Sequence, residues 1–159
     1  MKPILQSPPQ QALPIRALQV ILFALSAGLV LFAVVAAFMR SLDERVSGTA
    51  EIAQLLAYVA VGLILPSLAM AYWLRSQALK KVVASKEEAL ALIRQDRVPV
   101  ALSTATIAAA AVAEAPGLLA IVTYLLQAPP HVLAVPVLSA GVILMMLPSR
   151  ERLEDALRG

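Results

Sequence analysis

Long runs without charge are the feature that most constrains this chain. Residues 17–39 and 52–74 each form an uncharged, largely apolar run of 23 residues. At a rise of about 1.5 Å per residue, such a helix crosses a hydrocarbon core of about 30 Å. Of all residues 60% are hydrophobic and 14% are charged, whereas soluble domains are about a quarter charged. The sequence therefore predicts an all-α protein whose helices cross a membrane.

Four membrane-spanning helices are predicted, at residues 16–39, 51–74, 99–126 and 130–147. The first run is longer than the roughly 7–15 apolar residues of a signal peptide. We therefore interpret it as the first transmembrane helix and not as a signal peptide that is cleaved off. Pro66 should kink the second helix, because it removes the bond to the Gly62 carbonyl. Asp96 is predicted to cap the first turn of the third helix, and Pro99 suits a position where the amide would lack a helical partner. The fourth span is short for a membrane crossing.

The polar segments divide the chain further. Residues 1–14 are rich in proline and should form a disordered tail before the membrane domain, residues 15–148. Ser85 and Glu88 have capping-box spacing, which predicts a short amphipathic helix over residues 86–94, between the second and third spans. Residues 149–159 should be a cytoplasmic tail that contains a short amphipathic helix.

The basic residues predict the orientation. Eleven of the 13 Lys and Arg residues flank the spans in the N-terminal tail, the segment 75–97 and the C-terminal tail. With four spans these three segments share one side of the membrane, and only Arg40 and Arg45 lie on the other. The positive-inside rule then places both termini in the cytoplasm of a bacterial-type inner membrane. The same patches predict contact with lipid and none with nucleic acid, and anionic lipid could bind at Arg75, Lys80, Lys81 and Lys86.

Several classes of function lack support in the sequence. The chain has no cysteine and one histidine, His131, which argues against a thiol enzyme or a protein-ligated transition metal. We find no nucleophile–base pair, phosphate-binding loop, dinucleotide fingerprint or metal-ligand spacing. The sequence therefore predicts a protein that is not an enzyme and that holds no cofactor or metal.

Glu114 is the main candidate functional residue. It is the only charged residue between positions 98 and 126, and a carboxyl group deep in a membrane suggests a function. Ala110, Ala111 and Gly117 share its side of the helix and would let another helix approach. Pro116 frees a carbonyl half a turn away. Because no Lys or Arg lies at this depth in another span, we expect the carboxyl to be buried and uncharged.

Two resemblances bear on this helix. The alanine-flanked glutamate within residues 108–126, followed by Gly117 and Leu118, is similar to the ion-carrying helix of rotary ATPase proteolipid (c) subunits, which implies that Glu114 binds a proton or sodium ion. The chain differs from that family by carrying the glutamate in its third span. The motif Ala-x-x-Glu-x-Pro-Gly-Leu at residues 111–118, with the tail Leu-Pro-Ser-Arg-Glu-Arg-Leu-Glu-Asp at residues 147–155, resembles uncharacterised small four-span bacterial inner-membrane proteins.

The sequence leaves three roles open for Glu114. It could form a hydrogen bond between helices, carry a proton or cation, or bind a ligand such as a quinone or lipid. We predict a structural or accessory subunit, or a homo-oligomer, in which Glu114 lies at a contact between helices. The alternative is a transporter-like protein that moves a proton or cation and in which Glu114 titrates.

Overall fold

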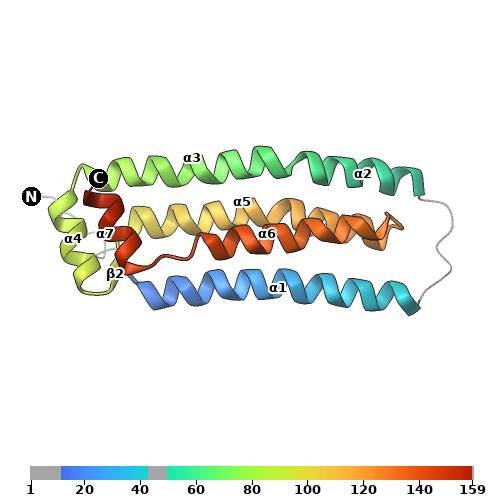
Figure 1. Ribbon diagram of the computed structural model, residues 1–159, viewed down its shortest axis with the longest axis horizontal. Helices are drawn as coiled ribbons and strands as arrows, with labels where there is room; N and C mark the ends of the chain where they lie inside the picture. The colour runs from blue at the N-terminus through green and yellow to red at the C-terminus, as the bar shows by residue number, and fades with distance from the viewer. Residues whose placement is uncertain (1–11, 43–49, 159) are drawn as a thin grey trace, which may run out of the picture.

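The computed structural model describes residues 12–42 and 50–158 and is mainly a bundle of long helices (Figure 1). The long elements are α1 (Ile15–Leu42), α2 (Ala50–Gly62), α3 (Ile64–Val83) and α5 (Val100–Leu125). The shorter ones are β1 (Leu13–Pro14), α4 (Lys86–Arg94), β2 (Arg97–Val98), the 3-10 helix η1 (Pro130–Leu133), α6 (Ala134–Met145) and α7 (Arg150–Arg158).

Helix α5 is the centre of the bundle. It packs against α1 on one side and against α2 and α3 on the other, and α6 lies over α1 and α5. The side of α5 that these helices cover is built largely from Ala, Ser, Thr and Gly. Small side chains let helix backbones approach closely, and close approach provides the packing that holds helices together in lipid.

Two prolines in long helices act differently. The second apolar run is interrupted at Leu63, between α2 and α3, one residue after the Gly62 carbonyl that Pro66 leaves without a helical partner. Regular bonds continue on both sides, because the Leu63 amide donates to Val59 and the Ser67 amide to Leu63. Helix α5 runs through Pro116 without interruption. The helix is thus interrupted next to the carbonyl that Pro66 leaves free, and the kink predicted there stays a prediction.

The beginning of α1 is joined to the beginning of α5 by a short pair of strands. Strands β1 and β2 are antiparallel, with Leu13 opposite Val98 and Pro14 opposite Arg97. Asp96 adopts a positive φ of 57°, and its carbonyl accepts a bond of 2.9 Å from the Ile15 amide. The prediction of a disordered tail is wrong for Leu13 and Pro14, and residues 1–11 lie outside the described part.

The two short amphipathic helices form where the sequence predicts them, but their caps differ. Ser85 precedes α4, yet its hydroxyl donates to the Val82 carbonyl instead of capping the helix. Asp96 likewise does not cap α5, whose N-cap residue is Pro99. Ser149 does cap α7, because its hydroxyl oxygen accepts a bond of 3.3 Å from the Arg152 amide.

Three helices are long and apolar enough to cross a membrane: Ile15–Leu42, the combined helix Glu51–Val83, and Val100–Leu125. The predicted fourth span is a shorter apolar helix, Pro130–Met145, formed by η1 and α6. It lies along the bundle beside α1 and α5 (Figure 1). The described part is thus an all-α bundle apart from the two-residue strands, with four apolar segments side by side.

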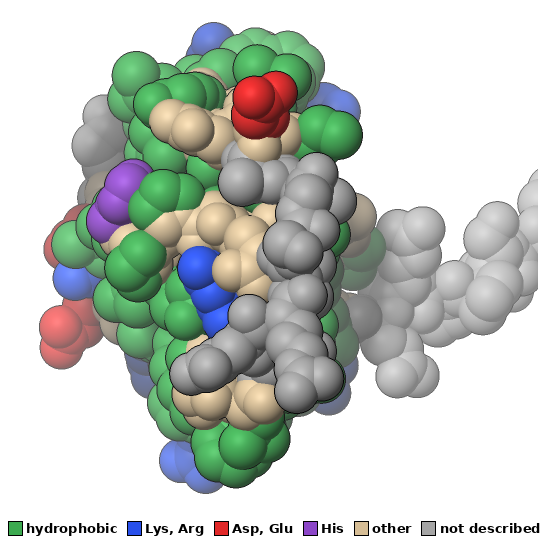
Figure 2. Space-filling view, turned by 90° about the vertical axis from the view of Figure 1, so that its right-hand side faces the viewer, with side chains coloured by type: hydrophobic (Ala, Val, Ile, Leu, Met, Phe, Trp, Pro, Cys, Tyr) green, Lys and Arg blue, Asp and Glu red, His purple; other side chains and the backbone are tan. Residues whose placement is uncertain are grey.

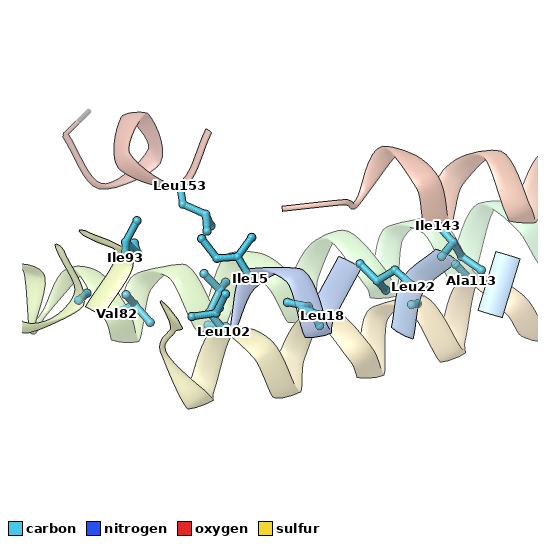
Figure 3. Packing of buried hydrophobic residues seen from close by; sticks show 13 residues of the cluster. Ile15, Leu18, Leu22, Val82, Ile93, Leu102, Ala113, Ile143 and Leu153 are labelled. Atoms are coloured by element: carbon cyan, nitrogen blue, oxygen red, sulfur yellow. The ribbon is translucent and has the colours of Figure 1, made fainter. Parts of the chain in front are cut away.

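A hydrophobic cluster closes the end of the bundle where α4 and α7 lie (Figure 3). Leu153 of α7 is 4% exposed and packs with Ile15 of α1 and Ile93 of α4. Leu18 and Leu22 continue the cluster along α1 toward Ile143 of α6. The beginning of α1, the segment around α4 and the C-terminal helix are therefore held together at one end of the molecule (Figure 1).

Candidate functional site

Glu114 lies in the middle part of α5 and is half-buried in the single chain. No hydrogen bond or ion pair joins its carboxyl group to another residue of the described ranges. Gly117 and Ile121 follow it by three and seven residues and so share its side of the helix. Both face α1, where Ile121 packs with Leu29 and Ala33. Glu114 therefore lies at the edge of the α1–α5 contact.

The covered side of α5 next to Glu114 is tightly packed. Added to Gly117, a Cβ atom would lie 3.0 Å from Leu29 Cδ2, 3.2 Å from Pro136 Cα and 3.2 Å from Ser139 Cβ. Ala110 is fully buried beside leucines of α1. The close approach that the sequence predicted at these two residues thus occurs within the chain, with α1 and α6.

The opposite side of α5 has no covering helix in the single chain. An exposed row of residues follows the helix with alternating spacings of three and four, which is the spacing of a helix–helix seam. Its members are exposed apart from the half-buried Ala108, and most are small: Ala101, Thr104, Ala108, Ala111, Ala115, Leu118 and Val122. We call this row the open face of α5. Glu114 borders it, between Ala111 and Ala115.

A groove runs beside the open face where α5 meets α3. It has a volume of about 750 Å³. Ala101, Thr104 and Ala108 lie on its α5 side, and Trp73 and Gln77 lie on its α3 side. The first part of the open face therefore forms one wall of this groove.

Pro116 lies on a different side of α5 from the open face that Glu114 borders. With Ala113 it lines an apolar hollow of about 180 Å³ between α3, α5 and α6, which also contains Ser67 and Ser139. Glu114 does not line this hollow. Of the four residues predicted around Glu114, Ala110, Pro116 and Gly117 are therefore buried by the chain itself, and Ala111 is exposed.

Arg40 is a residue whose importance the sequence analysis missed. One nitrogen of its guanidinium, Nη1, donates to the Tyr124 carbonyl at 2.9 Å and also to the Ala128 carbonyl. The guanidinium carbon lies 4.3 Å from the centre of the Tyr124 ring. Arg40 thus places further donors and a positive charge at the C-terminal end of α5, where the helix dipole favours a cation. Figure 2 views this end, whose coloured part is mainly hydrophobic and uncharged.

Two of the four basic residues predicted to bind lipid line different hollows. Arg75 lines a pocket with Arg152 of the C-terminal helix. Lys81 lines the groove between α3 and α5 instead. Lys80 and Lys86 are exposed. The sequence could not reveal the contribution of Arg152, because it follows Arg75 by 77 positions along the chain.

The arrangement contains no metal site in its described part, where no three His, Asp or Glu side chains gather as ligands. Comparisons with protein-family models, with curated proteins and with solved structures find no match for the chain. The fold and composition define a class: a helical membrane protein with three helices long enough to cross a bilayer. Within this class the candidate site is the open face of α5 together with Glu114.

Proposed function

We propose that this protein is a non-enzymatic structural subunit of a membrane assembly, and that it associates with a second copy of itself through the open face of α5. We also propose that it lies in a bacterial-type inner membrane with both termini in the cytoplasm, because the basic residues of the described chain gather at the end that carries α4 and α7.

One observation carries the proposal: the central helix combines an exposed row of small residues with a carboxyl group that has no partner in the described chain. Small residues at alternating spacings of three and four suit a close contact between parallel helices. Two copies with the same orientation in a membrane, related by an axis along its normal, present parallel α5 helices to each other.

Glu114 then acts as a donor at the edge of this contact. An uncharged carboxyl group can donate a hydrogen bond to an oxygen of the neighbouring copy. Polar bonds between helices in a membrane contribute about 0.6–2 kcal/mol, which corresponds to about a 3- to 30-fold change in a dissociation constant. Glu114 would therefore adjust the strength of the association, while the packing of small residues provides most of it.

Cross-linking tests the contact, and the chain suits it because it contains no cysteine. Ala111→Cys and Ala115→Cys each place one thiol on the open face, and oxidation in native membranes should give disulfide-linked dimers. Val137→Cys is the matched control, because Val137 of α6 is 60% exposed and adjoins Pro136, which packs on Gly117. Equal dimer yields from all three variants would overturn the proposed interface.

Variants of Glu114 test the role of the carboxyl group and separate it from ion transport. Glu114→Gln keeps a hydrogen-bond donor and cannot titrate, so it should associate like the parent protein. Glu114→Ala should weaken the dimer about 3- to 30-fold, as measured by dilution in detergent or lipid. If proteoliposomes of the parent protein carry a proton or sodium flux that Glu114→Gln abolishes, the protein is a transporter and the structural proposal is wrong.

A further inference from the structure

A second candidate site lies at the basic end of the bundle and is independent of association through α5. Here a pocket of about 250 Å³ opens between α3, α5 and α7. It is lined by two arginines and by aromatic, hydroxyl and leucine side chains: Tyr72, Arg75, Ser76, Leu79, Leu102, Arg152 and Leu153. The arginines come from different helices, so the pocket exists only when α7 is docked.

Packing and capping fix the position of Arg152. Its neighbour Leu153 is buried against Ile15 and Ile93 (Figure 3). The Ser149 hydroxyl accepts the Arg152 amide hydrogen and so holds the first turn of α7. Arg150 of the same turn pairs with Glu154 at 3.0 Å. Arg152 therefore faces the pocket, while the nearby Arg150 is engaged along the helix.

Among the described residues that line the pocket, two are arginines and none is acidic. Arg75 is half-buried, and the Arg152 guanidinium is near enough to act on it as a like charge. Within the described ranges neither arginine forms an ion pair with an acidic side chain. Two guanidinium groups in one pocket repel each other, and an oxyanion between them would replace repulsion by charge-assisted hydrogen bonds.

The depth of the pocket indicates the source of such an anion. Tyr72 and Trp73 are 77% and 53% exposed, and such aromatic side chains mark the headgroup level of a membrane. Arg75 follows Trp73 by two residues, so we expect its guanidinium to lie near the level of the lipid phosphates. We propose that the pocket binds the phosphate group of an anionic phospholipid, held by Arg75 and Arg152.

Lipid retention in native mass spectrometry tests this site. The parent protein, purified in detergent, is mixed with phosphatidylglycerol or with phosphatidylcholine of the same acyl chains. We expect stronger retention of phosphatidylglycerol, and a loss of about tenfold or more in its affinity for Arg75→Gln and for Arg152→Gln, because each removes a charged hydrogen-bond donor. Arg150→Gln is the matched control, since it removes the same charge from the same turn of α7.

Two further measurements make the test decisive. If both arginines hold one phosphate, their contributions to affinity are coupled. The double variant should then lose less affinity for phosphatidylglycerol than the product of the two single-variant losses. Equal losses for Arg150→Gln and Arg152→Gln would overturn the pocket in favour of general surface charge. Millimolar inorganic phosphate should leave the melting temperature of the lipid-free protein unchanged, and an increase that requires both arginines would overturn a lipid as the source.

Discussion

The two sides of α5 are built from similar residues and have opposite surroundings. On the covered side Ala110, Ala113 and Gly117 are buried by α1 and α6. On the open face Ala111 and Ala115 are equally small and exposed. Small residues in a membrane helix thus mark places where another helix can approach. Which of these places the chain fills by itself depends on the arrangement of the other helices.

Two charged residues at α5 also differ in whether the chain supplies their partners: Arg40, which reaches it from α1, and Glu114, which belongs to it. The guanidinium of Arg40 finds two carbonyls and an aromatic ring at the end of the helix. The carboxyl group of Glu114 finds no partner in the described chain. We therefore expect Arg40 to contribute to the stability of the fold and Glu114 to contribute to association. The following substitutions test this distinction, from the largest expected effect on the free energy of unfolding to the smallest.

Gly117→Leu should have the largest effect. Even a Cβ atom would crowd Leu29 and the Pro136 backbone, so a larger side chain must push α1 and α6 away from α5. Overpacking of this kind costs about 3 kcal/mol, measured by denaturant unfolding in detergent. Gly141→Leu is the control, because a Cβ atom there meets nothing within 4 Å. Similar losses in both variants would contradict tight packing on the covered side.

Arg40→Gln should have the next largest effect. It removes a charged donor from the Tyr124 and Ala128 carbonyls and a cation from the Tyr124 ring. Together these should cost about 2 kcal/mol of stability. Arg40→Lys keeps the charge but lacks the planar group of donors, so it should recover only part of the loss. Full recovery would show that charge alone matters at this end of α5.

Ser26→Ala should have a small effect. The Ser26 hydroxyl donates to the Ala140 carbonyl at 3.3 Å and so links α1 to α6. Such bonds in membrane bundles contribute about 0.6 kcal/mol. Ser41→Ala is the control, because its hydroxyl bonds to Phe38 within the same helix. A thermal unfolding series should rank Ser26→Ala below the parent protein and Ser41→Ala level with it.

Glu114→Ala should have the smallest effect on the fold. Without a partner to lose, its free energy of unfolding should stay within about 0.5 kcal/mol of the parent value, provided that both are measured as monomers at low protein concentration. A loss above that of Ser26→Ala under these conditions would mean that Glu114 supports the fold, and the distinction between the two sides of α5 would fail.

Much of the fold followed from patterns that are local in sequence. The uncharged runs predicted the long helices, Pro66 predicted a kink in the helix that is interrupted at Leu63, and the polar segments predicted α4 and α7. The caps at Ser85 and Asp96 were wrong, and the pairing of Leu13–Pro14 with Arg97–Val98 was missed. The Ser85 hydroxyl takes a local partner, the Val82 carbonyl, whereas Asp96 and the strand pair depend on where the beginning of α1 meets the segment before α5.

The candidate sites likewise combine features that are local in sequence with features that depend on contacts between helices. The sequence by itself determined that the protein is helical, that it suits a membrane, and that Glu114 is the lone charge in its helix, because apolar length and charge are properties of single segments. Only the tertiary structure decided that α5 is central, that Gly117 is covered while Ala111 is open, and that Arg40 meets Tyr124 and Arg152 meets Arg75. The reason is that burial and pairing belong to the contacts between helices, and those contacts are set by the packing of the whole bundle.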